Sequence, residues 1–352
     1  MNKKELDLGI QYLRGAAVLF VVFFHLRSIL STTVPGINLG DMLFGEGSAG
    51  VDVFFVISGY IIALSTQSTA NASPKSFFIK RFFRIYPPFI FCLAAFLIVK
   101  NHFGEVYSLG QMVRSATMLH IDYASEAPYF GYNILYPAWT LAYEVYFYFI
   151  FLLALLVSHK HRITIATALI LLPTIITQIY FNGSVSLRAH GVGPYGSSIL
   201  NMIVSPMFFE FAAGMWLYVI RNSMPKSDFW KYIYISIAVI SAFGIFSAVN
   251  AGHGIDGYGV WALCVVSSIV FIERCSPLPK INSLFLLGEV SYSIYLSHVI
   301  IIAIALDYML SLGYKGFPLL IMMTCACVLF SMFMYRFIEK KSIDFGRRLI
   351  IN

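Results

Sequence analysis

Two polar side chains in the first apolar stretch of the chain have the chemistry to hold and activate a substrate. Arg14 and His25 lie eleven residues apart in QYLRGAAVLFVVFFH. On an α-helix this spacing gives a rise of about 16 Å and directions within about 20° of each other. Ala17, Val18 and Val21 lie between them on that face, and their modest size predicts a narrow passage. The alternative is that the Arg14 side chain extends to the membrane interface and that His25 caps a contact between helices.

Carboxylates lie at a similar depth in two other apolar stretches. Glu144 lies inside the outer end of one stretch, and Asp52 lies near the outer end of GVDVFFVISGYII. A membrane carboxylate is costly unless it is paired. Either group would therefore hydrogen-bond His25 and orient it as a base. The alternative for both carboxylates is a pairing that only stabilises the fold. For Glu210 in FFEFAAG we favour such a structural role.

Hydroxyl groups and a second histidine follow helical spacing elsewhere. In SYSIYLSH, Ser291, Tyr295 and His298 are spaced i, i+4, i+7 on one helix face. Ser58 precedes Gly59, and a glycine permits close approach of another backbone or a ligand. These side chains would line a passage. The alternatives are that Ser58 and Gly59 form a contact between helices through their small side chains, and that His298 is a buried core histidine.

A pair of arginines lies at the expected cytoplasmic edge. Arg81 and Arg84 are three residues apart in KSFFIKRFFRIYPP, so they share a helix face, and Pro87 and Pro88 are expected to interrupt the segment. Two guanidinium groups at this spacing can clamp a phosphate. Anchoring against anionic lipid is the alternative.

The composition places these residues in a membrane. Of 352 residues, 59% are hydrophobic and only 12% are charged, which is too apolar for a soluble domain. The pattern predicts an all-α, polytopic integral membrane protein in the lipid bilayer. The ten expected helices lie near 9–30, 49–66, 84–100, 137–158, 163–181, 198–220, 232–250, 257–273, 289–312 and 316–337.

Basic residues predict the orientation of these helices. With the N-terminus in the cytoplasm, eighteen of the 24 Lys and Arg residues fall inside, five fall outside and Arg14 lies within a span. This asymmetry follows the positive-inside rule, so both termini are expected in the cytoplasm. It also explains the net charge of +7, and we expect no nucleic-acid partner.

The chain reads as one membrane-embedded domain over residues 1–352, without an internal repeat or linker. Residues 101–136 and 182–197 form long outer connections that would cover an opening, or are plain connectors. The five cysteines have no CxxC spacing, so they are expected to be packing residues, and no metal site is expected.

Five segments in this order resemble the acyltransferase-3 family of membrane acyltransferases: LRGAAVLFVVFFH, GVDVFFVISGYII, KRFFRIYPP, YPAWTLAYEVYFYF and VSYSIYLSH. YRFIE, which ends at Glu339, extends the resemblance, although Lys340 stands where a proline is common. The resemblance implies about ten membrane helices and transfer of acyl groups, usually acetyl, to hydroxyls of surface glycans. It implies a bacterial cytoplasmic (inner) membrane protein with acetyl-coenzyme A, or another acyl-coenzyme A, as donor.

The resemblance also implies roles for the residues above. His25 is expected to be the general base or a covalent acyl carrier, and Glu144 or Asp52 its orienting carboxylate. Arg14, Arg81 and Arg84 are expected to hold acyl-coenzyme A. Ser58, Tyr295 and His298 are expected to line the passage or to stabilise an oxyanion.

Some relatives carry a fused SGNH-hydrolase-type domain, for which this chain has no room. It would therefore act alone or pass its acyl group to a separate extracytoplasmic transferase. A small-solute transporter and a structural subunit of a glycan-assembly complex are alternative functions. The absence of a visible repeat or of paired broken spans disfavours a transporter.

The distribution of basic residues yields a test of topology. Fusion of either terminus to a reporter that is active only outside the cytoplasm should give no signal. A fusion after Ile255 should be active, because this position follows an odd number of expected spans. The opposite pattern would overturn the ten-helix orientation.

Overall fold

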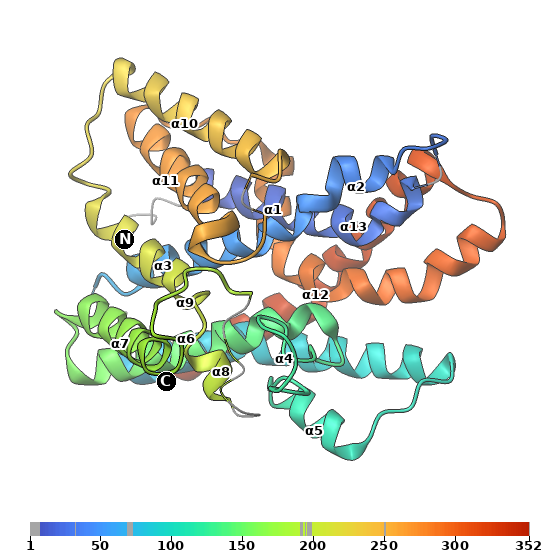
Figure 1. The fold of residues 1–352 in the computed structure, drawn as a ribbon, viewed down its shortest axis with the longest axis horizontal. Coiled ribbons are helices and arrows are strands. Elements are labelled where there is room, and N and C mark those ends of the chain that lie inside the picture. Colours follow the sequence, from blue (N-terminus) through green and yellow to red (C-terminus); the bar gives the residue numbers. More distant parts are fainter. Residues whose placement is uncertain are drawn as a thin grey trace.

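The fold is a bundle of helices that are long and apolar enough to cross a membrane. A computed structural model describes residues 8–31, 33–68, 73–190, 193, 195, 199–249 and 251–351. Ten helical stretches within these ranges have the length and composition of membrane spans, which confirms the predicted all-α polytopic class. These residues contain no β-strand, only two isolated bridges. Figure 1 shows these helical stretches as a ribbon that is coloured along the sequence.

Within the described ranges, the helices follow one another without a second folded unit between them. Their bounds are α1 Leu8–Leu26, α2 Leu39–Phe44, α3 Gly50–Ser65, α4 Pro74–His102, α5 Leu109–Ala116, α6 Trp139–Val157, α7 Arg162–Asn182, α8 Leu200–Ile203, α9 Phe208–Ile220, α10 Asp228–Phe246, α11 Val260–Cys275, α12 Asn282–Ser311, α13 Gly316–Met334 and α14 Lys340–Ile351. Most agree with the expected ranges to within a few residues. The expected helix 198–220 is divided into α8 and α9, and the last helix continues through a π-helical turn into α14.

Helix α4 begins ten residues before its expected start and continues through Pro87 and Pro88. The expectation that these prolines interrupt the segment was wrong. Pro87 has no N–H to donate to the Phe83 carbonyl, but the hydroxyl of Ser342 in α14 donates to that oxygen over 2.5 Å. A remote helix thus supplies the missing donor, which is how proline is tolerated in membrane helices.

The polar face of α1 is directed at α12. Arg14 Nη2 donates to Ser291 Oγ over 2.9 Å, and the rings of His25 and His298 are 5.1 Å apart. The prediction that Arg14 and His25 share one face is therefore confirmed.

The expected passage between Arg14 and His25 is filled by core packing. Ala17, Val18 and Val21 are all at most 6% exposed and belong to the hydrophobic clusters. Gly50 brings α3 against them, since a Cβ there would lie 2.6 Å from the Ala17 carbonyl oxygen. The prediction of a passage along this strip was therefore wrong.

Helices α3 and α9 are in contact through a reciprocal pair of glycines. A Cβ on Gly59 would lie 2.1 Å from the Phe211 carbonyl oxygen, and one on Gly214 would lie 2.0 Å from the Val56 carbonyl oxygen. The expected close approach at Gly59 is thus a helix contact. It lets Phe55 stack on Phe211 with ring centroids 4.5 Å apart.

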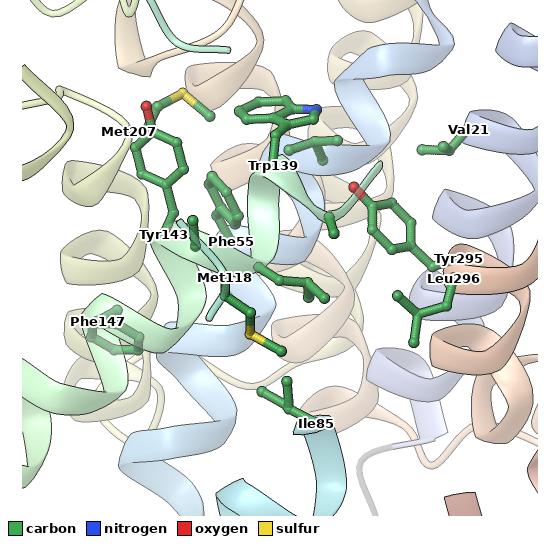
Figure 2. Close-up of a cluster of buried hydrophobic side chains, with 14 of the residues drawn as sticks. Val21, Phe55, Ile85, Met118, Trp139, Tyr143, Phe147, Met207, Tyr295 and Leu296 are labelled. Atoms are coloured by element: carbon green, nitrogen blue, oxygen red, sulfur yellow. The ribbon is translucent and has the colours of Figure 1, made fainter. Parts of the chain in front are cut away.

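Figure 2 shows this part of the core, with Phe55, Tyr143 and Phe147 gathered beside α3 and α6. The phenol of Tyr295 reaches from α12 toward the start of α6, where Trp139 lies. The Tyr295 hydroxyl donates to the Pro137 carbonyl over 2.8 Å, which joins α12 to the beginning of α6.

The glycine pair yields a stability prediction. Gly59→Ala and Gly214→Ala should each lower stability by about 1 to 3 kcal/mol, because the added Cβ meets backbone that cannot move aside cheaply. The thermal unfolding midpoint of the detergent-purified protein measures this effect. Gly110→Ala is the control, because a Cβ there would meet nothing closer than 3.9 Å. Midpoints equal to that of the control would contradict the proposed contact.

Candidate active site

A small cavity brings together polar residues from five stretches that are distant in sequence. It has a volume of about 80 Å³, and α1, α3, α4, α6 and α12 form its wall. We call it the inner chamber. Its polar lining residues are Arg14, Ser58, Arg81, Arg84, Thr140, Glu144, Tyr148, Ser291, Tyr292 and Tyr295. Six of the nine residues predicted to form the site therefore border one cavity, while His25, Asp52 and His298 do not line it.

Glu144 is bound by neighbours within the inner chamber. Its Oε1 accepts from Ser58 Oγ over 3.0 Å and from the Tyr148 hydroxyl. Arg81 in turn donates to the Tyr148 oxygen over 3.4 Å and to Ser65 over 3.1 Å. The carboxylate is thus joined to a cation through a tyrosine. The prediction that it hydrogen-bonds His25 was wrong.

Arg14 and Arg84 lie in the same cavity, and neither forms an ion pair with a carboxylate in the described part of the chain. Arg14 is 9% exposed and donates to two neutral groups, Gln11 Oε1 over 3.2 Å and Ser291 Oγ over 2.9 Å. No hydrogen bond or ion pair joins the Arg84 side chain to the described part of the chain. Because a cation within an apolar bundle is costly without compensation, this pair suits an anionic or strongly polar ligand.

A larger cavity lies against the inner chamber. It has a volume of about 710 Å³ and shares Arg14, Ile61 and Arg84 with the chamber wall. We call it the basic vestibule, because its basic lining residues are Arg14, Arg84, Arg221, Lys226 and Arg274, with Glu273 as the acidic one. Leu8 also lines it, so the vestibule lies beside the start of α1.

The two histidines lie beyond Tyr295. The Tyr295 ring borders the inner chamber and lies 6.2 Å from the ring of His298, which contacts His25 in turn. The prediction that Ser291, Tyr295 and His298 share one face of α12 is therefore confirmed. Ser291 contacts Arg14, Tyr295 borders the chamber and His298 contacts His25.

Hydrogen bonding assigns the tautomer of His298. Its Nδ1 lies 3.1 Å from the Ile294 carbonyl oxygen, which can only accept, so Nδ1 carries the proton. Nε2 is then a bare acceptor, and it is buried without a hydrogen-bond partner in the described residues. Neutral His298 can accept a proton at Nε2, but it cannot donate from that atom to an oxyanion. The predicted oxyanion role does not fit this form.

Asp52 belongs to a different cluster. It is fully buried, and its carboxylate lies 2.7 Å from His253 Nδ1 and accepts from the Gly254 N–H over 3.2 Å. The prediction that Asp52 hydrogen-bonds His25 was therefore wrong. Sequence reasoning missed His253, although its place in the glycine-rich segment AGHGIDGYG before α11 was a usable signal.

Comparison with known proteins bears on what this arrangement does. The chain matches the model of the acyltransferase-3 family, described as an acyltransferase domain, over residues 7–336. It is 24% identical over 318 residues to the exopolysaccharide production protein ExoZ of Rhizobium meliloti, covering 86% of this chain and 92% of ExoZ. It is 26% identical over 357 residues to BcsY of Komagataeibacter xylinus, a candidate membrane-bound transacylase, covering 96% of this chain and 83% of BcsY.

A candidate O-acetyltransferase of Staphylococcus aureus strain COL is also similar. It is 26% identical over 364 residues, which cover 94% of this chain and 56% of that protein. No solved structure matches the chain. The family model spans nearly all of the helical bundle, including every stretch that contributes to the inner chamber. The chain therefore belongs to the acyltransferase-3 family and is an integral membrane acyltransferase.

Proposed function

We propose that this acyltransferase modifies surface glycans. It moves an acyl group, with acetyl as the expected group, from cytoplasmic acyl-coenzyme A to a hydroxyl of a cell-surface glycan or its lipid-linked precursor. One observation carries the proposal: Arg14 and Arg84 border both the basic vestibule and the inner chamber. The acceptor class is taken from relatives, of which one is named for exopolysaccharide production and another for O-acetyl transfer.

The donor enters through the basic vestibule, whose cations attract its phosphates. Coenzyme A is made in the cytoplasm, so the vestibule opens to that side of the bacterial inner membrane. The thioester end occupies the inner chamber. A water molecule needs about 10 to 15 Å³ of such a cavity, so the chamber of about 80 Å³ holds several groups of that size. This volume suits an acetyl thioester better than a long acyl chain.

The transfer joins the acceptor oxygen to the acyl carbon and breaks the carbon–sulfur bond of the thioester. His25 takes the hydroxyl proton as the oxygen attacks, and the leaving thiolate recovers a proton from His25 or from water. His298 supports this role: its ring lies 5.1 Å from that of His25, and its Nε2, which has no partner among the described residues, would accept an N–H from His25 in this mechanism. The other His25 nitrogen then stays unprotonated, which is the form that a base needs.

The negative charge that develops on the thioester oxygen needs donors whose protons are not already in use. The hydroxyl of Ser58 donates to Glu144, and that of Tyr295 donates to Pro137. Neither hydroxyl is therefore available to the oxyanion, and we assign Arg14 and Arg84 to holding the polar atoms of the donor within the inner chamber.

Replacement of His25 tests the proposed base. His25→Ala should lower acyl transfer by about 10² to 10⁴-fold, the usual contribution of a general base, and should leave donor binding intact. Mass spectrometry of the surface polysaccharide at matched protein levels measures the transfer. His102→Ala is the control, because His102 is an exposed histidine at the end of α4. Near-normal acylation by the His25 variant would return this residue to a structural role.

The two arginines of α4 should differ in their effects. Arg84→Ala should weaken acyl-coenzyme A binding by about 1 to 3 kcal/mol, because it removes a charged donor that is not engaged elsewhere. Arg81→Ala should chiefly disturb the Tyr148 and Glu144 network, and so lower turnover more than affinity. Isothermal titration of the purified protein, combined with kinetics, separates the two. Unchanged donor affinity in the Arg84 variant, with normal expression, would favour lipid anchoring.

A further inference from the structure

We infer that Arg221, Lys226 and Arg274 form a binding site for the 3′-phosphorylated nucleotide end of coenzyme A. The inference rests on the proposed function, since it locates the end of the donor that is remote from the thioester. These three side chains line the basic vestibule but not the inner chamber, whereas Arg81 lines the chamber alone. The cations are therefore divided between two places along one route.

The three cations come from neighbouring parts of the fold. Arg221 and Lys226 lie in the connection between α9 and α10, and Arg274 lies in the last turn of α11. Arg221 Nη1 donates to the Tyr60 hydroxyl over 2.8 Å, and Arg274 Nη1 donates to Asn222 Oδ1 over 2.6 Å. These bonds hold both guanidinium groups in place at the wall of the vestibule. Such held, planar cations suit a phosphate.

Lys226 is the cation with the least restraint. Its side chain is exposed, and no hydrogen bond or ion pair joins it to the described residues. A lysine acts on a phosphate as a mobile point charge, so it can follow a ligand that the two arginines position.

The acidic residue of the vestibule is already engaged. Glu273 accepts the backbone N–H groups of Leu8 and Gly9 over 2.8 and 2.9 Å. N–H groups at the start of a helix have no partner within it, and a carboxylate there is stabilised by the helix dipole. Glu273 thus binds the start of α1, and five basic side chains line the same cavity.

The charge and size of the vestibule match one part of the donor. The 3′-phosphate is a monoester and carries about 1.5 to 2 negative charges at pH 7. Each phosphate of the doubly esterified pyrophosphate carries about one, so this end of the donor carries about four. The cavity of about 710 Å³ falls in the range of pockets that enclose whole small molecules. A lipid headgroup would satisfy the same cations, but it would not need a cavity that shares Arg84 with the chamber of the thioester.

The test compares coenzyme A with dephospho-coenzyme A, which lacks only the 3′-phosphate. The probes are titrated into the full-length protein in phosphatidylcholine nanodiscs. The unmodified protein should prefer coenzyme A by about tenfold, the effect of about 1.4 kcal/mol from one charge-assisted contact. Lys226→Ala and Arg274→Ala should remove most of this preference. Lys226→Arg should restore it, and adenosine 3′,5′-bisphosphate should compete with coenzyme A.

Lys160→Ala is the matched control, because Lys160 is exposed in the connection between α6 and α7 and lies outside both cavity walls. Thermal unfolding midpoints show whether each variant is folded. Normal coenzyme A binding with an unchanged preference in folded variants would overturn this inference alone. The inference would also fail if phosphatidylglycerol nanodiscs abolished the effect of the substitutions, because the cations would then serve a lipid headgroup. A failure of the unmodified protein to bind coenzyme A would overturn the proposed donor as well.

Discussion

The positive charge of Arg14 and Arg84 inside an apolar bundle is the constraint on which the site depends. Neither guanidinium forms an ion pair with a carboxylate among the described residues, although the buried carboxylate of Glu339 attracts both from a greater distance. Helices that packed closely around these charges would desolvate them without any compensating contact. The five helices around them instead leave a chamber, and the chamber continues into a vestibule with more cations. The cavity thus surrounds two charges that the protein compensates only in part, which leaves room for a ligand or water to solvate them.

Close packing elsewhere offsets the packing that is lost at this opening. Gly59 and Gly214 bring α3 and α9 into backbone contact, and Gly50 brings α3 against the face of α1 between Arg14 and His25. The cavity is therefore confined to one side of α3, where Ser58 reaches Glu144. Small residues on one face and polar residues on another let the same helix close one interface and border a cavity at the next.

Much of this fold follows from properties that are local in sequence. The length of apolar runs predicts the ten spans, and helical periodicity places Arg14 with His25 and Ser291 with His298. The errors concern partners that are remote in sequence. Pro87 is tolerated within α4 because Ser342, far away in the sequence, donates to the Phe83 carbonyl that Pro87 leaves open. Asp52 binds His253 rather than His25, and spacing within one helix cannot reveal that choice.

The order of groups along α12 connects the cavity to proton transfer. Ser291 contacts the arginine that borders both cavities, Tyr295 forms part of the chamber wall, and His298 contacts His25. Since the Ile294 carbonyl takes the Nδ1 proton, neutral His298 has its lone pair at Nε2. A histidine beside an acceptor is more easily held in the tautomer that a base requires. If His25 is the base that we propose, the backbone of α12 therefore helps to set its tautomer through His298, before any substrate arrives.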